Sequence, residues 1–309
     1  MSLADSAAST RPLRVTPRSA WRPESGATPA LRGSVRDVVD LLRGGNVVAL
    51  TGAGMSTESG IPDYRGPDGS RRVTPMTIEE FRDGEAGARR YWSRAYVGWN
   101  RFRAARSNAG HEALASIQGA GCLDAVITQN VDGLHQEAGS RRVIELHGTL
   151  TRVVCVDCGA RLLRDRVQAA LTRLNPGYLE AALDDAGSIR PDGDVDLPLS
   201  LEHRFRVARC EECAGVHLKP DVVFFGESAD RQTVQACFEA VDRAQALLVL
   251  GSSLAVMSGL RFVRHAATRG LPVAIITNGP TRGENLAAIR LLGPLGTVLP
   301  EIAEAVRSG

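Results

Sequence analysis

The stretch that decides the fold runs from Val47 to Gly66 and has the sequence VVALTGAGMSTESGIPDYRG. Its first four residues form an apolar run that is typical of a buried parallel strand. Gly52 and Gly54 follow, and glycine allows the backbone to turn sharply and to approach a ligand closely. We predict that the Ser56-Thr57 pair caps a helix whose first amides hold a phosphate group.

The same stretch ends in a polar cluster, Asp63-Tyr64-Arg65, on a loop bounded by Pro62 and Gly66. The glycine spacing departs from the G-x-G-x-x-G fingerprint, and no acidic residue ends a second strand about 20 residues later. Alone, the stretch therefore indicates either a nucleotide-binding loop or an ordinary strand-to-helix turn of an α/β protein.

Composition narrows the classes of protein to consider. The chain has 309 residues, of which 43% are hydrophobic, which is enough for a core and excludes a disordered chain. A net charge of +2 gives no reason to expect nucleic acid or an anionic membrane as a partner. Lys219 is the only lysine, and we attribute this to genome base composition.

Residues 1–33 are rich in Ser, Ala, Arg and Pro and contain no apolar run. We predict a disordered tail, with an organelle presequence as the alternative, and no secretory signal. No apolar run elsewhere is long enough to cross a bilayer. The expected location is the cytoplasm, or the mitochondrial matrix in a eukaryote, where disulfides are rare.

Apolar runs and helical patterns alternate along the chain. Strands are predicted at 47–50, 125–128, 143–146, 222–225, 246–250, 273–276 and 297–299. Helices are predicted at 34–42, 75–106, 111–117, 165–174, 230–243, 256–269 and 284–291. The alternation predicts an α/β fold with a doubly wound, Rossmann-like parallel sheet. We assign residues 34–150 and 214–305 to this domain, and residues 151–213, with part of the helical region 67–110, to an inserted module.

Polar clusters follow the predicted strands at 51–66, 128–132, 145–148, 225–227, 251–253 and 277–279. Ligands of such sheets bind at the carboxyl ends of the strands. The clusters therefore predict one composite site. Six aromatic side chains between 81 and 102 are expected in the core or along an apolar cleft.

Four cysteines form two C-x-x-C pairs, Cys155/Cys158 and Cys210/Cys213. Two such pairs in a reducing compartment predict a closed, structural zinc site with four thiolate ligands, one ion per chain. The alternatives are a redox pair and a nucleic-acid-binding zinc ribbon, and the latter lacks a basic and aromatic stripe. Cys122 and Cys237 are expected to be buried structural thiols.

Taken together, the motifs resemble the sirtuins, which are NAD-dependent protein-lysine deacylases. The resemblance extends from about Ser34 to Ile302 and rests on sequences that occur in sirtuin order. These are Gly52-Ala53-Gly54-x-Ser56, Gly60-Ile61-Pro62-Asp63-Tyr64-Arg65, Thr128-Gln129-Asn130-Val131-Asp132, Leu146-His147-Gly148, the cysteine pairs, Lys219-Pro220-Asp221, Phe225-Gly226-Glu227 and Gly251-Ser252-Ser253.

Within that family the chain looks most like class II, the group of the mitochondrial lipoamidase and ADP-ribosyltransferase sirtuin. The long spacer between the cysteine pairs fits this group. The sequences behind it are Arg90-Tyr91-Trp92, Val97-Gly98-Trp99, Ala138-Gly139-Ser140-Arg141-Arg142, Pro191-Asp192-Gly193-Asp194-Val195 and Gly279-Pro280-Thr281-Arg282.

The resemblance implies a set of NAD-binding residues. Gly52, Ala53, Gly54 and Ser56 would hold the diphosphate, and Ile61, Pro62, Asp63, Tyr64 and Arg65 would lie on a loop that closes over NAD. Gln129, Asn130, Val131 and Asp132 would contact the nicotinamide and its ribose. Gly251, Ser252, Ser253, Thr277, Asn278, Gly279 and Leu295 would lie beside the phosphates and the adenosine.

The resemblance also implies the catalytic and substrate-binding residues. His147 would be the general base, with Asn130 and Asp132 as the other catalytic residues; an imidazole titrates near neutral pH, which suits this role. The acyl-lysine peptide would add as a strand between Phe225-Gly226-Glu227 and Ser253-Leu254-Ala255. The expected products are nicotinamide and 2′-O-acyl-ADP-ribose, from a protein expected to be monomeric.

Two departures from the family pattern affect these expectations. Thr277 stands where the family usually has an asparagine, and Asn278 follows it, so either could contact the adenosine ribose. The Tyr91-Trp92-Ser93-Arg94 sequence matches an acidic-acyl signature one helical turn too early, and we treat it as accidental. The alternatives to deacylation are mono-ADP-ribosylation of proteins and a non-catalytic scaffold. Longer acyl chains are a hypothesis based on the aromatic helices.

Overall fold

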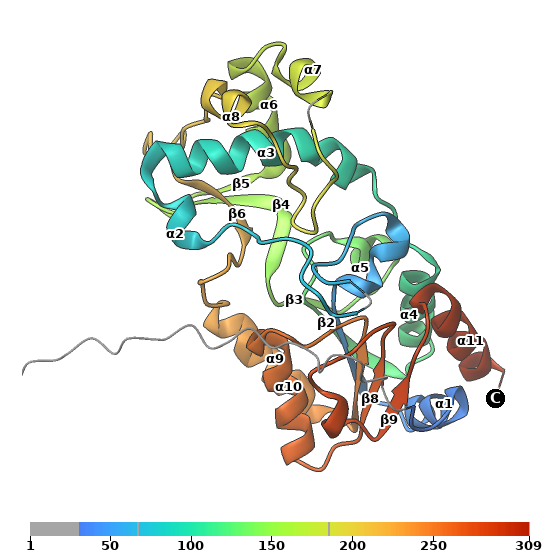
Figure 1. Cartoon of the computed structure of the whole chain (residues 1–309). Helices are drawn as coiled ribbons and strands as arrows, with labels where there is room; N and C mark the ends of the chain where they lie inside the picture. The colour runs from blue at the N-terminus through green and yellow to red at the C-terminus, as the bar shows by residue number, and fades with distance from the viewer. Residues whose placement is uncertain (1–30, 67, 185, 309) are drawn as a thin grey trace, which may run out of the picture.

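The structure, a computed structural model, describes residues 31–66, 68–184 and 186–308 (Figure 1). The predicted tail at 1–33 lies outside this part of the chain except for its last three residues. Within the described residues, no helix combines the length and the apolar character that a membrane span requires. Two β-sheets organise the described part of the chain.

The larger sheet has six strands, all parallel, which confirms the predicted doubly wound fold. Its spatial order is β3-β2-β1-β7-β8-β9. The chain therefore adds strands on one side of β1 first and then on the other. A ligand crevice is expected at this switch point, beyond the carboxyl ends of β1 and β7. The strands are β1 (Val47–Thr51), β2 (Leu123–Thr128), β3 (Val143–Glu145), β7 (Ala246–Leu250), β8 (Val273–Ile276) and β9 (Ile289–Leu291).

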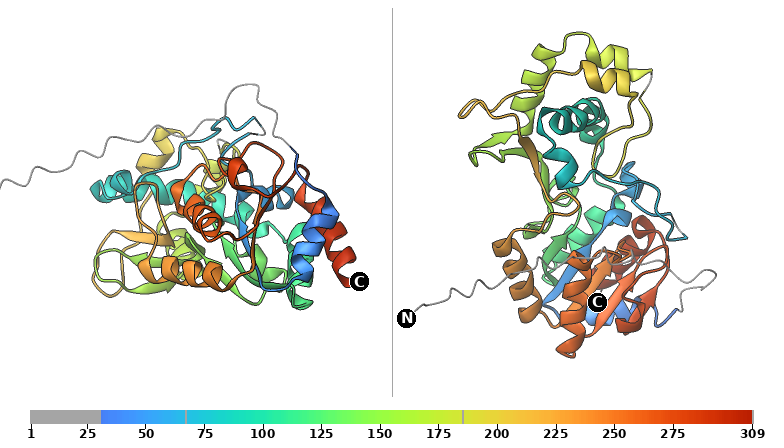
Figure 2. Two further views of the ribbon diagram at one scale, coloured as in Figure 1. Left: turned by 90° about the horizontal axis from the view of Figure 1, so that it is seen from below. Right: turned by 60° about the vertical axis from the view of Figure 1, so that its left-hand side comes forward.

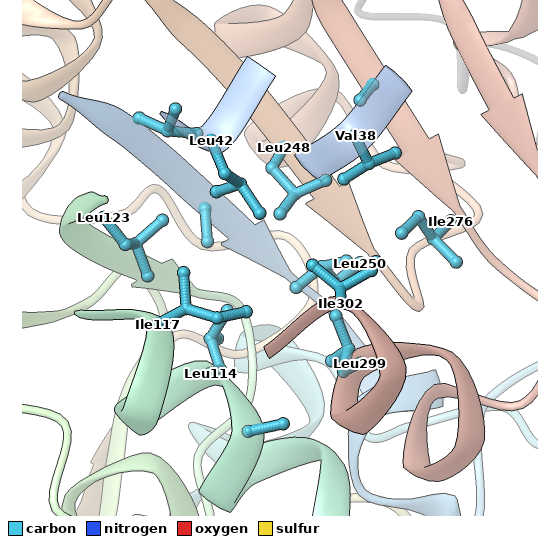
Figure 3. Close-up of a cluster of buried hydrophobic side chains, with 14 of the residues drawn as sticks. Val38, Leu42, Leu114, Ile117, Leu123, Leu248, Leu250, Ile276, Leu299 and Ile302 are labelled. Carbon is cyan, nitrogen blue, oxygen red and sulfur yellow. The ribbon is translucent and has the colours of Figure 1, made fainter. Parts of the chain in front are cut away.

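Three helices cover one face of this sheet: α1 (Val35–Arg43), α4 (Ala109–Gly119) and α11 (Leu295–Arg307). Figure 3 shows Leu42, Ile117 and Ile302 from these helices meeting the strand side chains. The α1 helix begins as predicted, because Ser34 accepts a hydrogen bond from the Asp37 amide in a capping box. α9 (Arg231–Arg243) and α10 (Met257–Thr268) cover the other face. Burial on both faces explains why the strands are continuous apolar runs.

The smaller, antiparallel sheet has the order β5-β4-β6. Its strands are β4 (Gly148–Cys155), β5 (Arg161–Leu163) and β6 (Leu218–Val222), so they extend a few residues beyond the predicted insertion at 151–213 on both sides. Figures 1 and 2 show its helices at the end of the molecule away from α9 and α10. These helices are α2 (Ile78–Phe81), α3 (Gly84–Ala104), α6 (Arg164–Leu174), α7 (Tyr178–Leu183) and α8 (Leu199–Arg204).

The aromatic residues of α2 and α3 belong to the core. Phe81, Trp92, Tyr96, Trp99 and Phe102 are all buried. The buried guanidinium of Arg164 lies 4.7 Å from the Trp92 ring centre and 4.5 Å from that of Trp99. Five of the six predicted aromatic side chains therefore lie in the core rather than form a cleft wall. Three of them belong to the core of this second module, while Trp99 and Phe102 pack with Ile61 and Leu134 of the larger domain.

The prediction of a strand of the parallel sheet at 222–225 was wrong, both in the residues of the strand and in its pairing. β6 ends at Val222 and pairs antiparallel with β4 in the smaller sheet. The Val223 amide donates to the His147 carbonyl oxygen at 2.9 Å, which ties the following segment to the active-site loop. The apolar run Val222-Val223-Phe224-Phe225 thus leaves the sheet as a loop between the two modules.

Two predictions near the C-terminus were also wrong. Residues 284–291 form a short 3₁₀ turn, η3 (Glu284–Leu286), and the edge strand β9 instead of a helix. Residues 297–299 lie inside α11 rather than in a strand. A short apolar run such as Thr297-Val298-Leu299 does not distinguish a strand from a buried helix. Pro300 lies inside α11, where proline is unusual, and this made a helix look improbable from the sequence.

Candidate active site

A large cavity of about 1160 Å³ lies between the two modules. Typical small-molecule pockets have volumes of about 300–1,000 Å³, so this cavity exceeds the space that one small ligand needs. Every residue that the sequence suggested for NAD or peptide binding lines it, from Gly52 in the loop after β1 to Leu295 at the start of α11. His147 lines the same cavity. The structure thus brings the predicted set together, and the role of each residue stays a prediction.

The glycines after β1 serve the contact between two loops at the switch point. A Cβ on Gly52 would lie 2.8 Å from the Ser252 Cβ, and one on Gly54 would lie 2.9 Å from the Gly251 carbonyl oxygen. The Gly54 amide donates to that same oxygen at 2.9 Å. A side chain at either position would push the loops after β1 and β7 apart.

The helix predicted to begin at Ser56-Thr57 is absent from this described segment. Two 3₁₀ turns, η1 (Ala53–Met55) and η2 (Thr57–Ser59), follow β1 instead. Ser56 caps neither turn with its side chain, which turns toward the loop after β2. The predicted phosphate site at an α-helix N-terminus is therefore wrong, although the glycine loop itself lines the cavity.

Ser56, Asn130 and Asp132 form a hydrogen-bonded group on the floor of the cavity. Ser56 Oγ donates to Asp132 Oδ2 at 2.7 Å, and Asn130 Nδ2 donates to Ser56 Oγ at 3.0 Å. The Leu134 amide, at the start of α5 (Leu134–Glu137), donates to Asp132 Oδ1 at 3.0 Å. Burial raises the pKa of Asp132, while the hydrogen bonds from Leu134 and Ser56 oppose that change. These hydrogen bonds hold the three side chains in one arrangement.

His147 follows β3, and both of its ring nitrogens have partners. Nδ1 lies 3.0 Å from the Gln129 carbonyl oxygen, and Nε2 lies 2.9 Å from Ser258 Oγ. A carbonyl oxygen only accepts, so Nδ1 carries the proton of the neutral ring and Nε2 keeps its lone pair. Burial lowers the pKa of His147; the Gln129 hydrogen bond raises it and the Arg261 charge lowers it further. The ring is therefore neutral at pH 7 and able to accept a proton.

Gln129 is fixed from three directions. Its Nε2 donates to Ser252 Oγ at 2.9 Å and to the Thr51 carbonyl oxygen at 3.1 Å. On the third side lies Gly259 of α10, where a Cβ would be 2.6 Å from Gln129 Oε1. The side chain is thus held where the loops after β1, β2 and β7 meet.

The end of the cavity where the adenosine is predicted contains both residues that could contact its ribose. Thr277 is buried and Asn278 is exposed, and both line the cavity together with Leu295. Arg290 on β9 is buried beneath this loop. Its Nη2 donates to the Gly279 carbonyl oxygen at 2.7 Å, and its Nη1 donates to the carbonyl oxygens of Thr277, at 3.4 Å, and Leu291. Arg290 therefore supports the loop that the adenosine would contact.

The four predicted metal ligands come together at the edge of the smaller sheet. The sulfur atoms of Cys155, Cys158, Cys210 and Cys213 all lie within 4.8 Å of one another. Cys155 Sγ is 3.6 Å from Cys213 Sγ, and Cys158 Sγ is 3.7 Å from Cys210 Sγ. Four thiolates around zinc at about 2.3 Å would lie about 3.8 Å apart. The cluster fits a tetrahedral zinc ion, which would link the two turns that carry the cysteine pairs.

Comparison with known proteins decides the family. The model of the Sir2 family matches residues 52–258, which span the glycine loop, the zinc ligands and the start of α10. The chain belongs to the Sir2 family.

Its Sir2 relatives are similar over nearly their whole length. It is 50% identical over 293 residues to NAD-dependent protein deacetylase 1 of Streptomyces coelicolor, covering 94% of this chain and 96% of the relative. It is 42% identical over 296 residues to NAD-dependent protein deacylase SIR4 of Batrachochytrium dendrobatidis, covering 89% of this chain and 96% of the relative. The NAD prediction agrees with these names.

The fold agrees with solved Sir2 structures. A Sir2 complex with a p53 peptide and NAD⁺ has a TM-score of 0.69 at 28% identity, covering 90% of this chain and 100% of that one. Sir2Af2 bound to a myristoylated histone peptide has a TM-score of 0.62 at 25% identity, covering 89% of this chain and 96% of that one.

Sequence reasoning missed several residues that line the site of this Sir2 protein. Ser258 and Arg261 lie in the first turns of α10, within a pattern that predicted only an amphipathic helix. Asp192 and Asp194 reach the cavity from the second module, whereas the sequence identified them only within a class II sequence and gave them no place in the site. Of the Tyr91–Arg94 segment, Tyr91 lines the cavity, whereas Arg94 pairs with Asp194 at 3.3 Å. This geometry agrees with treating the acidic-acyl match as accidental.

Proposed function

We propose that this Sir2-family protein is an NAD-dependent protein-lysine deacylase that transfers the acyl group of acyl-lysine to ADP-ribose. The observation that carries the proposal is the neutral, Nδ1-protonated His147 in the same cavity as Asn130, Asp132 and Gln129. NAD enters as a co-substrate. It supplies a ribose carbon that the acyl oxygen attacks as nicotinamide leaves.

In this proposal each group has a task that its geometry supports. His147 Nε2 accepts a proton that leaves a ribose hydroxyl, because it keeps its lone pair and its neighbour Ser258 lines the same cavity. Asn130 and Asp132 hold the nicotinamide, because they are fixed by Ser56 beside Ile61 and have further polar capacity. Gln129 orients the ribose, since its amide is locked in place.

The acyl-lysine segment would bind between residues 225–227 and 253–255. Both segments line the cavity: residues 225–227 lie in the connection from β6 to α9, and residues 253–255 follow β7. The Ile78 amide donates to the Phe225 carbonyl oxygen at 2.9 Å, and the Arg282 amide donates to that of Ser253 at 2.9 Å. These hydrogen bonds hold both segments in place for the incoming peptide. A peptide added as a strand would be recognised mainly through its backbone.

We further propose that the protein belongs to class II, on the sequences given above and on the similarity to a fungal relative named a deacylase. The proposal does not specify which acyl group the protein prefers. The aromatic-channel hypothesis loses most of its basis, because Tyr91 lines the cavity while the other five aromatic side chains are buried in the core. Relative turnover of acetyl-, octanoyl-, lipoyl- and glutaryl-lysine peptides measures the preference. Acetyl-lysine turned over far faster than the rest would refute a preference for long chains.

The test of catalysis is nicotinamide release from NAD in the presence of an acyl-lysine peptide. The wild-type protein should release nicotinamide in a peptide-dependent manner, and His147→Ala should reduce the rate to background. His203→Ala is the matched control, because His203 is exposed on α8 in the second module. Equal background rates for the wild type and His147→Ala would refute the enzyme proposal.

A further inference from the structure

The nitrogen that the proposed reaction needs as a base already has a protein partner. Ser258 Oγ lies 2.9 Å from His147 Nε2. Because His147 Nδ1 donates to the Gln129 carbonyl oxygen, the neutral ring must accept at Nε2. Ser258 therefore donates its hydroxyl proton to the Nε2 lone pair. Ser258 and His147 both line the cavity, so the contact between them is made at its wall.

Ser258 is held in this place by the helix that carries it. It is the second residue of α10, whose 12 residues pack against the larger sheet. The next residue, Gly259, brings the first turn so close to Gln129 that a Cβ would lie 2.6 Å from Oε1. The backbone that follows the serine is thus packed against Gln129, whose carbonyl oxygen binds the other ring nitrogen. The hydroxyl cannot move away from His147 without rotating about its own side-chain bond.

A positive charge lies one helical turn further along α10. Arg261 lines the cavity, and its Nε donates to the Met257 carbonyl oxygen at 3.4 Å. Its charge opposes protonation of His147. Ser258 and Gln129, which contact the ring directly, are uncharged. The first turns of α10 therefore act on the ring in two ways, through one hydrogen bond and one charge.

We propose that Ser258 is a positioning residue for His147: its hydroxyl holds the imidazole in the Nδ1-protonated form with the Nε2 lone pair directed into the cavity. This deepens the proposed function and rests on it. When substrate binds, the ribose hydroxyl takes the place of the serine hydroxyl at Nε2. The proton then passes from the ribose oxygen to Nε2, and Ser258 keeps its own.

The test compares Ser258→Ala, which removes the hydroxyl, with Ser258→Thr, which keeps it. Ser258→Ala should lower kcat on the order of 10- to 100-fold, because a misplaced catalytic group has this effect, with a much smaller change in KM for NAD. Loss of a donor to the neutral ring also raises the pKa of His147, so the acidic limb of the kcat/KM profile should move to higher pH. Ser258→Thr should restore most of the activity and the wild-type profile.

Ser200→Ala is the matched control, because Ser200 is exposed on α8, which does not line the cavity. Arg261→Gln gives a second, independent measurement: it should move the acidic limb to higher pH as well. If the wild type is active and Ser258→Ala matches it in both kcat and pH profile, the positioning role is refuted and the deacylase proposal stands. If His147→Ala is as active as the wild type, the deacylase proposal itself fails.

Discussion

Replacing Arg94 by alanine should destabilise the protein, and the loss should grow with pH. Arg94 is buried on α3, where its Nη2 lies 3.3 Å from Asp194 Oδ2 and 3.2 Å from Asp196 Oδ1. Its Nε donates to the Val195 carbonyl oxygen at 3.0 Å. The arginine thus anchors the hairpin at 189–195 to α3. At Gly193 the hairpin approaches this helix closely, since a Cβ on Gly98 would lie 2.3 Å from the Gly193 carbonyl oxygen.

The expected magnitude depends on the charge of Asp194. Burial, and then the charge of Asp192, raise the pKa of Asp194 from 3.8 to about 8. Below that pH the Asp194 side chain is largely neutral, so the variant loses hydrogen bonds and the ion pair with the exposed Asp196, together about 1–2 kcal/mol. Above it, the buried carboxylate retains Arg190, at 3.6 Å, as an ion-pair partner. Removing one partner of a buried pair costs about 3–5 kcal/mol, so we expect a loss of about 4 kcal/mol at pH 9.

The sign of the pH dependence follows from proton binding. The folded protein holds a proton on Asp194 that the unfolded chain releases near pH 3.8, so the contribution of Asp194 to wild-type stability falls as pH rises from about 4 to about 8. Removing Arg94 raises this pKa further and extends the fall to higher pH. Urea unfolding at pH 6 and pH 9 measures both effects. Arg103→Ala is the control, since Arg103 lies on the same helix in an exposed pair with Asp165, worth at most about 1 kcal/mol. A loss in Arg94→Ala no larger than that control, or no larger at pH 9 than at pH 6, would refute the reasoning.

Three further predictions concern the zinc cluster, the adenosine loop and the single lysine. Cys158→Ala should abolish binding of one zinc per chain and destabilise the second module, as measured by metal analysis and thermal unfolding. The control Cys122→Ala should retain the metal, because Cys122 lies outside the cluster. Arg290→Met should raise KM for NAD on the order of 10-fold with a smaller effect on kcat, since it frees the carbonyl oxygens of Thr277 and Gly279; an unchanged KM would contradict the supporting role. Lys219 is buried, and its Nζ donates to Glu227 Oε2 at 2.9 Å. An amine-reactive acyl ester should therefore label the native protein at its α-amino group and spare Lys219, as measured by peptide mass spectrometry. Rapid labelling of Lys219 would contradict its burial.

The larger sheet and the zinc cluster were predictable because both leave regular marks in the sequence. Buried parallel strands are continuous apolar runs, and Ala246–Leu250 is buried at every position. Paired cysteines define a metal site by spacing alone. The polar residues that follow these strands predicted most of the residues that line the cavity, since parallel strands place their carboxyl ends at one edge of the sheet.

The errors arose where tertiary contacts override local pattern. β9 is three residues long and is defined by pairing with β8, which no local pattern encodes. Ser56 resembles a helix cap, but its hydroxyl bonds to Asp132, which lies 76 residues along the chain. Ser258 was missed because a serine in an amphipathic helix has no signal of its own. Its significance appears only when α10 packs against His147 and Gln129.

The most direct test of the central claim is the identity of the NAD-derived product. Wild-type protein, NAD labelled in its adenosine and an acyl-lysine peptide are incubated together, and both the small molecules and the protein are analysed by mass spectrometry. We predict acyl-ADP-ribose and nicotinamide in equal amounts, with neither formed by His147→Ala. Label found on protein without acyl-ADP-ribose would contradict deacylation and support ADP-ribosyl transfer instead.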